Sequence, residues 1–368
     1  MRWVEVVLPV EARGYHVYIG RGSLAELGRL AAEHRFPRRV AVITDTTVAG
    51  LYGDAALEAL AGAGFEAELL MFPPGEPSKT MDTVASLYDG LIRKAFDRGC
   101  GVCALGGGVV GDVAGFVAAT YLRGLPWIQV PTTLLAQVDS SVGGKTGVNH
   151  PAGKNLIGAF WQPRFVLIDP DLLSTLPPRE LHAGLAEVVK AGLIADPALF
   201  SLLEADWDGF LSGDPRLLEG AIEAACRVKA GVVSRDEREA GLRRVLNFGH
   251  TLGHALEAGT GYRHFLHGEA VAWGMIGAAW LSWKRGLLSG EDRARIEALL
   301  LRLPKPPIPD VTPERFREHL RRDKKIVAGR LHYVFLTGIG NAVVEEGIPE
   351  EELLSALDYL RDLQRRPS

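Results

Sequence analysis

Residues 1–178 alternate between short apolar runs and longer amphipathic stretches. Apolar runs bounded by glycine, proline or charge predict buried strands, and the stretches between them predict helices. Strands that alternate with helices form a mainly parallel sheet with helices on both faces. The expected strands are Val4–Val10, Tyr15–Ile19, Arg39–Thr44, Glu66–Met71, Gly101–Leu105, Trp127–Val130 and Phe165–Ile168, and the expected helices are Ser23–Glu33, Ala49–Ala63 and Thr80–Arg93.

The pattern changes after Leu176–Pro178, where helical periodicity takes over. We therefore expect an α/β domain over residues 1–178 and a mostly α-helical domain over residues 179–368. No low-complexity linker separates them, so we expect close packing with a cleft between the domains. The expected elements of the second domain are helices Glu180–Ile194, Pro215–Ser234, Arg243–Ala258, His267–Arg285, Glu291–Leu303, Thr312–Arg322 and Glu350–Gln364, with strands His332–Leu336 and Asn341–Glu345.

The composition excludes several classes of protein. A net charge of −4 gives no general attraction to nucleic acid or anionic membranes. No apolar run approaches the ~20 residues of a membrane-spanning helix, and the charged N-terminus predicts a strand rather than a signal peptide. Three cysteines cannot all pair, so we expect a cytoplasmic protein. Cys100 and Cys103 stand three apart in a strand pattern, where they point to opposite faces, which favours burial over metal binding.

A glycine-rich phrase, LGGGVVGDVAGF, occupies residues 105–116, between a strand pattern and a helix pattern. Glycines there let the backbone approach a pyrophosphate at the helix N-terminus. The spacing is not GxGxxG, so by itself the phrase is also compatible with tight packing and no ligand. The following phrases PTTLLAQVDSSVGGKTGVNH and GKNLIGAFWQP place polar groups among small residues, which indicates the wall of a ligand site. These groups are Thr132, Thr133, Asp139, Lys145, Lys154 and Asn155.

Potential metal ligands stand in the phrases AEVVK (Glu187), LNFGHTLGHALE (His250 and His254) and LHGEAVAWGM (His267). Two neutral imidazoles and one carboxylate form a catalytic zinc set that leaves positions open for substrate. His250 and His254 are four apart and share one helix face. They could be two ligands, one ligand and one acid/base, or a ligand beside a core histidine. His264 is a rival ligand in a turn-like phrase.

Lysine is scarce in this chain, with 10 among 41 basic residues, yet several lysines stand in polar, motif-like phrases. Lys190 follows Glu187 by one helical turn, Arg243 precedes His250 by seven residues, and Lys229 stands on the preceding predicted helix. Because cations gathered near a metal repel one another, we expect an anionic substrate that carries carboxylate, phosphate or both. The alternative is that Arg243 and Lys229 pair with Glu237 or Glu239 at a helix surface.

Taken together, these phrases resemble the 3-dehydroquinate synthase family, notably GGGVVGDVAGFVAATYLRG, QVPTTLLAQVDSSVGGKTGVN, KNLIGAFWQP, LAEVVKAGLI, LNFGHTLGHALE and LHGEAVAWGM. The resemblance runs from Asp45 through PPGEPSKT to RRDKK at Arg321–Lys325. It implies a Rossmann-like N-terminal domain, a helical C-terminal domain, bound NAD, a catalytic divalent metal (zinc, or cobalt) and a cytoplasmic homodimer.

The activity implied by the resemblance is the conversion of 3-deoxy-D-arabino-heptulosonate 7-phosphate to 3-dehydroquinate and phosphate in the shikimate pathway. NAD would oxidise the substrate transiently, phosphate would leave, the hydride would return, and ring opening and an intramolecular aldol reaction would close the carbocycle. NAD is regenerated in each turnover, so the net reaction is that of a lyase.

The resemblance also assigns roles to residues. The metal ligands would be Glu187, His250 and His267, with His254 as an acid/base. NAD would contact Asp45, Glu76, Lys79, Gly107, Gly108, Val109, Gly111, Asp112, Thr132, Thr133, Lys145 and Lys154. The substrate would contact Asp139, Lys145, Asn155, Lys190, Lys229, Arg243, Asn247 and Lys324 or Lys325, while Arg123 would reach the site of the partner subunit.

Three other functions compete with this prediction. Inosose and valiolone synthases use the same chemistry, but their substrates lack the carboxylate that Arg243, Asn247 and Lys229 would bind. A polyol dehydrogenase would share the GGG turn and a metal site, but it would not need SSVGGKTGVN or the anion-binding lysines. A non-catalytic scaffold would leave the metal ligands without a role, and metal-free purified protein would favour it.

Overall fold

The computed structural model describes residues 14–261, 263–309, 312, 314, 316, 326–327 and 330–365. Its first half contains a six-stranded sheet in the order β1-β8-β5-β4-β2-β3, in which every strand pair is parallel. Among all the described residues, no helix is both long enough and apolar enough to cross a membrane. The strands are β1 (His16–Ile19), β2 (Arg39–Asp45), β3 (Glu66–Phe72), β4 (Gly101–Gly106), β5 (Trp127–Pro131) and β8 (Phe165–Ile168).

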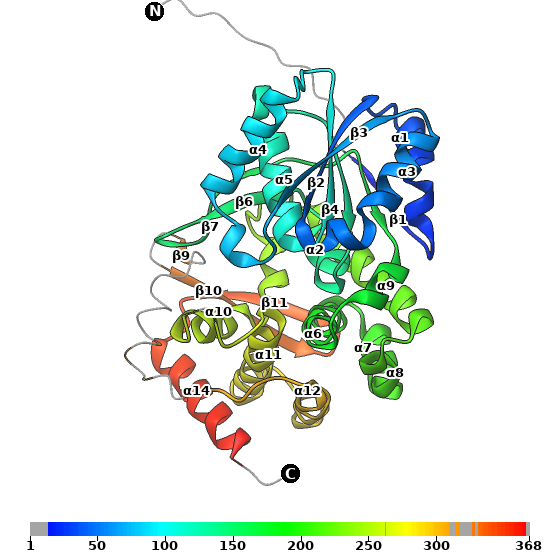
Figure 1. Cartoon of the computed structure of the whole chain (residues 1–368). Helices are drawn as coiled ribbons and strands as arrows, with labels where there is room; N and C mark the ends of the chain where they lie inside the picture. Colours follow the sequence, from blue (N-terminus) through cyan, green and yellow to red (C-terminus); the bar gives the residue numbers. More distant parts are fainter. Residues whose placement is uncertain are drawn as a thin grey trace, which may run out of the picture.

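Helices cover both faces of this sheet, as a parallel sheet with buried strands requires. Figure 1 shows α4 (Met81–Arg93) and α5 (Gly108–Thr120) on one side and α1 (Leu27–Glu33) and α3 (Asp54–Gly62) on the other. Each face has its own apolar cluster. Cys100 packs in one cluster and Cys103 in the other, both as buried free thiols, which confirms the prediction that they point to opposite faces.

A separate hairpin, β6 (Lys145–His150) and β7 (Gly153–Phe160), packs against α5. The sequence predicted a polar ligand wall here but no strands, because the phrase lacks the apolar alternation of a strand. Gly147 and Gly158 face each other across the hairpin, and a Cβ on Gly158 would lie 2.3 Å from the Thr146 carbonyl oxygen. The hairpin combines this close backbone approach with apolar packing, because Val148 is buried in the cluster that also contains residues of α5.

The second half is mostly helical and packs below the sheet in the view of Figure 1. Helix α11 runs through the middle of one apolar cluster, with α6, α10, α12, α14 and strand β10 around it. The helices are α6 (Pro178–Ala195), α7 (Pro197–Ala205), α8 (Trp207–Ser212), α9 (Pro215–Val233), α10 (His250–Gly259), α11 (His267–Lys284), α12 (Gly290–Arg302) and α14 (Glu350–Gln364), and the strands are β9 (Ile326–Val327), β10 (Arg330–Gly338) and β11 (Asn341–Glu346).

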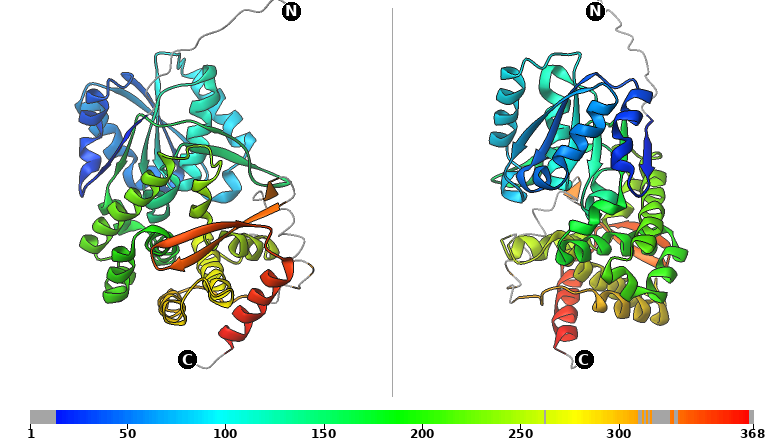
Figure 2. Two further views of the ribbon diagram at one scale, coloured as in Figure 1. Left: turned by 180° about the vertical axis from the view of Figure 1, so that it is seen from behind. Right: turned by 45° about the vertical axis from the view of Figure 1, so that its right-hand side comes forward.

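The architecture confirms the predicted fold class: a parallel α/β half joined to a mostly helical half (Figure 2). The predicted helix Arg243–Ala258 is wrong as one unit. A turn of 3-10 helix, η7 (Leu242–Asn247), ends before Gly249, whose φ of 77° interrupts the helix before α10 begins. The sequence also missed α7 and α8. The predicted strand Val4–Val10 lies outside the described residues, as does most of the predicted helix Thr312–Arg322.

Candidate active site

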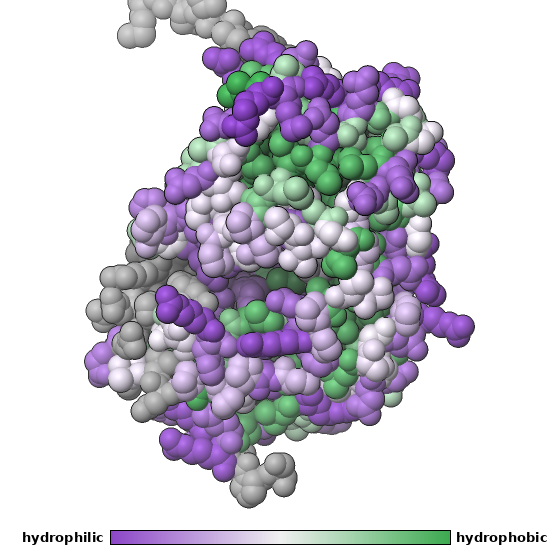
Figure 3. Space-filling view, in the orientation of Figure 1, coloured by the Kyte–Doolittle hydropathy of each residue, from purple (hydrophilic) through white to green (hydrophobic). Residues whose placement is uncertain are grey.

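Three neighbouring parallel strands end at the same edge of the sheet, the edge that faces the helical half. Asp45 ends β2, the glycine-rich turn follows β4, and Thr132 and Thr133 follow β5. Ligands of open parallel sheets bind at the carboxyl ends of the strands. The space-filling view shows the surface hollowed where the two halves meet (Figure 3).

The N-terminus of α5 provides a surface that could hold a phosphate. The N-cap residue of this helix is Gly107, which has no side chain to accept hydrogen bonds from the first amides. A Cβ on Gly107 would lie 3.0 Å from Thr133, and one on Gly108 would lie 3.1 Å from the Ser140 Oγ. This turn therefore requires small residues. Its backbone N–H groups could bind an anion.

Several predicted NAD contacts form pairs in the structure. Lys79 makes a buried ion pair with Asp112 on the first turns of α5. Burial raises the pKa of Asp112, although Lys79 acts against this shift. Glu76 accepts a 2.7 Å hydrogen bond from the amide of Asn149 on β6, which ties the PPGEPSKT loop to the hairpin. Asp45 caps α2 (Thr46–Val48) by accepting the amide hydrogens of Thr47 and Val48.

Glu187 of α6 faces the two histidines that the sequence grouped with it. The Glu187 Oε1 atom lies 3.7 Å from His250 Nε2 and 3.8 Å from His267 Nε2. Two atoms that each bind zinc at ~2.1 Å lie less than ~4.2 Å apart. Glu187 is only 2% exposed, and its Oε1 accepts no hydrogen bond from the described residues. An unsatisfied buried carboxylate oxygen between two imidazole nitrogens fits a metal ion.

Both imidazoles are held through their other ring nitrogen. His250 Nδ1 lies 3.1 Å from the Phe248 carbonyl oxygen, and His267 Nδ1 lies 3.2 Å from Glu257 Oε2. Each Nδ1–H donates to its oxygen, so the lone pair of each Nε2 points toward Glu187. Burial would raise the pKa of Glu257, but His267 and Lys154 outweigh burial and hold that pKa at about 2.

His254 completes a compact group with His250 and His267, whose ring nitrogens lie within 4.8 Å of one another. The His254 ring centroid is 5.4 Å from that of His250 and 5.7 Å from that of His267. The structure therefore leaves His254 close enough to be a third imidazole ligand or an acid/base beside the metal. His264, the rival considered from sequence, bonds the Pro307 carbonyl oxygen and does not join this group.

Buried charges continue from the histidines toward the sheet half. Lys190 pairs with Glu187, and Lys229 Nζ lies 2.7 Å from Asp139 Oδ1. Burial would raise the pKa of Asp139, but Lys229 and Lys190 hold that pKa well below its usual range. Burial lowers the pKa of Lys229, against the opposing effect of Asp139. Carboxylates of the chain thus partly compensate these cations, so the expectation that the cations repel one another holds only in part.

Arg243 is buried and reaches across to the sheet half. Its guanidinium donates to the Gly143 carbonyl oxygen at 3.2 Å and to the backbone carbonyl of Glu237. The surface pairing of Arg243 or Lys229 with a carboxylate of Glu237 or Glu239, the alternative raised from sequence, does not appear among the described contacts. Instead, Glu237 accepts from Gln162 at 2.8 Å.

Glu239 links two predicted substrate contacts, which the sequence did not foresee. Its carboxylate pairs with Lys145 of β6 and accepts a 2.7 Å hydrogen bond from Asn247. Glu239 has a φ of 61°, a conformation that is uncommon for a residue other than glycine. Only the folded chain brings Lys145 next to Asn247, so no local signal could have found this arrangement.

Asn155, Lys154 and Arg123 are further predicted site residues that the structure describes. The backbone N–H of Asn155 donates to Asn149 Oδ1 in the hairpin, and Lys154 Nζ lies 3.2 Å from Glu257 Oε1 in the helical half. Arg123 is exposed and has a φ of 72° in a turn beside Leu122, whose φ is 50°. Lys324 and Lys325 lie outside the described residues.

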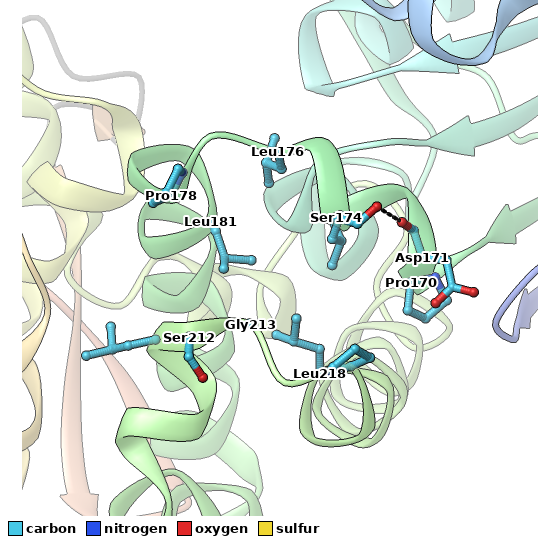
Figure 4. A pocket seen from close by; sticks show the side chains of 12 residues that line it. Pro170, Asp171, Ser174, Leu176, Pro178, Leu181, Ser212, Gly213 and Leu218 are labelled. Atoms are coloured by element: carbon cyan, nitrogen blue, oxygen red, sulfur yellow. Dashed lines mark hydrogen bonds between the residues drawn. The ribbon is translucent and has the colours of Figure 1, made fainter.

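A separate cavity lies away from these residues. A space of about 260 Å³ opens between the connection Pro170–Pro178 and helices α6, α8 and α9 (Figure 4). Leu181, Leu218 and the prolines give it an apolar lining, with Asp171 and Ser174 at one side. None of the predicted site residues lines it, so we do not assign the chemistry to this cavity. A much smaller pocket touches Asp139, Glu187, Lys190 and Lys229.

Comparison with known families decides between the competing functions. The model for the 3-dehydroquinate synthase N-terminal region matches residues 69–183, and the model for the C-terminal region matches residues 184–326. The chain belongs to the 3-dehydroquinate synthase family. A 3-dehydroquinate synthase of Geobacter metallireducens is 53% identical over 89% of this chain and 91% of that relative. One of Syntrophotalea carbinolica is 48% identical over 94% of this chain and 96% of that relative.

Solved structures of related cyclases share the fold of this family member. A 2-epi-5-epi-valiolone synthase of Streptomyces hygroscopicus, with NAD+ and Zn2+ bound, has a TM-score of 0.88 and 32% identity over 98% of this chain and 100% of that chain. A 2-deoxy-scyllo-inosose synthase complexed with carbaglucose-6-phosphate, NAD+ and Co2+ has a TM-score of 0.85 and 30% identity over 94% of this chain and 96% of that chain. A glycerol dehydrogenase of Schizosaccharomyces pombe, at 16% identity, shares the fold alone.

Proposed function

We propose that the chain acts as a 3-dehydroquinate synthase, converting 3-deoxy-D-arabino-heptulosonate 7-phosphate to 3-dehydroquinate and phosphate with NAD and a divalent metal. The observation that carries this proposal is the position of Glu187 between two imidazoles and next to buried Lys190. One pocket thus combines a metal-type ligand set with the means to bind an anion. The two 3-dehydroquinate synthases compared above are 48% and 53% identical to this chain, whereas the valiolone and inosose synthases are 32% and 30% identical. The higher sequence identity supports the first activity over the other two.

We assign the metal to Glu187, His250 and His267, with His254 as the neighbouring acid/base. The reason is the buried Oε1 of Glu187, which lacks any hydrogen-bond donor among the described residues and faces both Nε2 atoms. A carboxylate also lowers the net charge of a divalent site that lies close to Lys190. When bound, the metal would supply a Lewis acid for a substrate hydroxyl oxygen.

We assign NAD to the strand ends of the α/β half, because small residues and uncapped amides meet there. When bound, NAD would supply a reversible hydride acceptor. The first turn of α5 would hold the pyrophosphate, and Asp45 at the end of β2 is placed to contact a ribose. The other residues assigned to NAD are Glu76, Lys79, Gly107, Gly108, Val109, Gly111, Asp112, Thr132, Thr133, Lys145 and Lys154.

The remaining polar residues would bind and orient the two anionic groups of the substrate. Arg243, Asn247 and Lys229 would bind the carboxylate, since Arg243 and Lys229 are buried cations and Lys229 shares Asp139 with Lys190. Asp139 would hold Lys229 in position, and Lys190 would stay charged beside Glu187. Burial alone lowers the pKa of Lys190, but Glu187 and Asp139 outweigh burial and raise that pKa. The phosphate would meet Lys145 and Asn155, with Lys324 or Lys325.

We further propose a cytoplasmic homodimer in which Arg123 serves the site of the partner subunit. Arg123 is exposed and forms no ion pair with any described residue, although its turn holds two residues in left-handed conformations. Such strain is kept where the surroundings or a function demand it. The three free cysteines support a reducing compartment. We also propose that the boundary between the two domains lies between residues 178 and 179.

The test is phosphate release from 3-deoxy-D-arabino-heptulosonate 7-phosphate, measured with and without a chelator while the absorbance of bound nicotinamide is followed. We expect metal-dependent release of one phosphate per carbocycle and no lasting NADH. Accumulation of NADH without phosphate would indicate a dehydrogenase. If metal-replete protein turns over only the sugar phosphates of valiolone or inosose synthases, the proposed substrate is wrong.

A further inference from the structure

Glu257 lies between a proposed metal ligand and the hairpin of the other half. It sits near the end of α10 and is 3% exposed. Its Oε2 lies 3.2 Å from His267 Nδ1, and its Oε1 lies 3.2 Å from Lys154 Nζ. The two oxygens of one buried carboxylate therefore face two different partners, one on α11 and one on β7.

The contact with His267 fixes which ring nitrogen is available to a metal. A carboxylate that accepts from Nδ1–H leaves the lone pair of Nε2 free, and Nε2 is the atom that faces Glu187. His250 is held in the same sense by the Phe248 carbonyl oxygen. The two imidazoles differ in one respect: a neutral carbonyl holds His250, whereas a charged carboxylate holds His267. A carboxylate makes the ligand more basic and its orientation firmer.

The contact with Lys154 extends this link to the α/β half. Lys154 is the second residue of β7, in the hairpin that packs against α5. A buried carboxylate with one cationic partner and one imidazole has its position fixed from both sides. If the hairpin shifted, Glu257 would lose its contact with Lys154, and the ring of His267 would lose a neighbour that is fixed in position.

We propose that Glu257 is a positioning residue of the metal site, that its carboxylate holds His267 in the tautomer and orientation that bind metal, and that Lys154 of the hairpin holds this carboxylate in place. Metal affinity thus depends on contact between the hairpin and the helical half. The proposal rests on the proposed function only in that His267 binds the metal.

The test is the zinc affinity of the full-length chain, without NAD or substrate, measured by competition with a chromophoric chelator. Replacing Glu257 by Gln keeps the shape but removes the charge, and we expect zinc to bind ~10- to 100-fold more weakly. Lys154→Met should weaken zinc binding several-fold, with Glu257 still present. The matched control is Glu297→Gln, since Glu297 pairs with Arg293 and Tyr359 between α12 and α14 and should leave zinc affinity unchanged.

A purely structural role for Glu257 predicts a different result. Thermal stability would then fall while zinc affinity stayed within about twofold of the parent, and that result would overturn the proposal. Absorption bands of the cobalt-loaded chain give a second readout, because a reoriented His267 shifts them and a loss of stability alone does not. If Glu257→Gln does not fold, unchanged zinc affinity in Lys154→Met overturns the link to the hairpin.

These outcomes are separate from the test of the proposed function. A parent chain that binds zinc but does not release phosphate would refute the function and leave the role of Glu257 intact. A parent chain that turns over normally, with Glu257→Gln binding zinc as tightly as the parent, would refute only the role of Glu257.

Discussion

At the scale of single residues, the site depends on a few buried charges that each hold another group in place. Glu187 faces the two imidazoles and also pairs with Lys190, a buried residue of the same helix, α6. Charges buried to this degree are stable only with partners, so removing one member affects binding and folding together. The predictions at this scale separate these two effects.

Replacing Glu187 by Gln should abolish stoichiometric zinc binding, because the carboxylate is the charged ligand of the proposed set. The metal-free chain should also lose about 2 kcal/mol of unfolding free energy, less than a fully broken buried pair, since Asp139 stays 4.0 Å from Lys190. Metal analysis after gel filtration and urea unfolding of the metal-free chain measure the two effects. Glu180→Gln, on the exposed side of the same helix, is the control. Full zinc occupancy in Glu187→Gln would refute the ligand assignment.

Asp236 organises the loop that presents Arg243. Its carboxylate accepts the backbone N–H groups of Ala240, Gly241 and Arg243 at 2.8–2.9 Å, and these bonds, that of Arg243 first, lower the pKa of Asp236 to about 2. A carboxyl group whose pKa is lower in the folded than in the unfolded state stabilises the fold at every pH above its unfolded-state pKa. This stabilisation is lost as the pH falls toward the folded-state pKa.

Asp236→Asn should therefore be less stable than the parent by about 1 kcal/mol near neutral pH, a figure reduced for the partial exposure of Asp236. The difference should be constant above about pH 5 and shrink as the pH falls toward 2, because the parent carboxylate then becomes protonated. Urea unfolding of both chains at a series of pH values measures it. Asp358→Asn, at an exposed ion pair, should show no difference at any pH. A difference that grows on acidification would contradict the argument.

At the scale of helices, glycines set the distances between the elements that carry the ligands. A Cβ on Gly268 would lie 1.8 Å from the Ala183 carbonyl oxygen of α6, and one on Gly274 would lie 2.0 Å from the Gly249 carbonyl oxygen. Helix α11 thus touches α6 and the start of α10 backbone to backbone. This contact brings His267 close to Glu187 and His250.

Gly274→Ala should push α10 and α11 apart and weaken zinc binding at least tenfold, with a loss of ~1–3 kcal/mol in stability from overpacking. Chelator competition and urea unfolding of the full chain measure both. Gly220→Ala on α9 is the matched control, because no atom lies within 4 Å of the added Cβ. There we expect unchanged zinc affinity and a gain of up to ~1 kcal/mol, as alanine favours a helix. Parental zinc affinity in Gly274→Ala would show that helix spacing does not position the ligands.

The elements also show what a sequence can reveal. Regular apolar spacing predicted the strands of the sheet and most helices, because burial imposes that spacing. It could not predict the hairpin at 145–160, which is built on facing glycines, or the break at Gly249, which depends on one left-handed residue. Glu187, His250 and His267 could be proposed as ligands from the sequence because each stands in a characteristic local phrase, and the structure brings the three side chains together. Glu239 and Glu257 were not, because Lys145 and Lys154, which define their roles, lie about 100 residues away in sequence.

At the scale of the whole molecule, the proposed site requires both halves of the chain and, through Arg123, a second subunit. The strand ends supply the glycine-rich turn, the hairpin supplies Lys145 and Lys154, and the helical half supplies the histidines. Contacts between the halves include Lys145 with Glu239 and Arg243 with Gly143. The exposed Arg123 forms no ion pair with any described residue of its own chain.

Hybrid dimers can decide which site Arg123 serves. One subunit would carry Arg123→Ala and the other Glu187→Gln, with two affinity tags so that only the hybrid is purified. If Arg123 acts in the partner's site, one of the two sites keeps both residues, and the hybrid should have about half the parental activity. The control pairs a parental chain with one that carries both substitutions. In that hybrid each site lacks one residue, so we expect almost no activity. The opposite pattern, an inactive first hybrid and a half-active second one, would place Arg123 in the site of its own subunit.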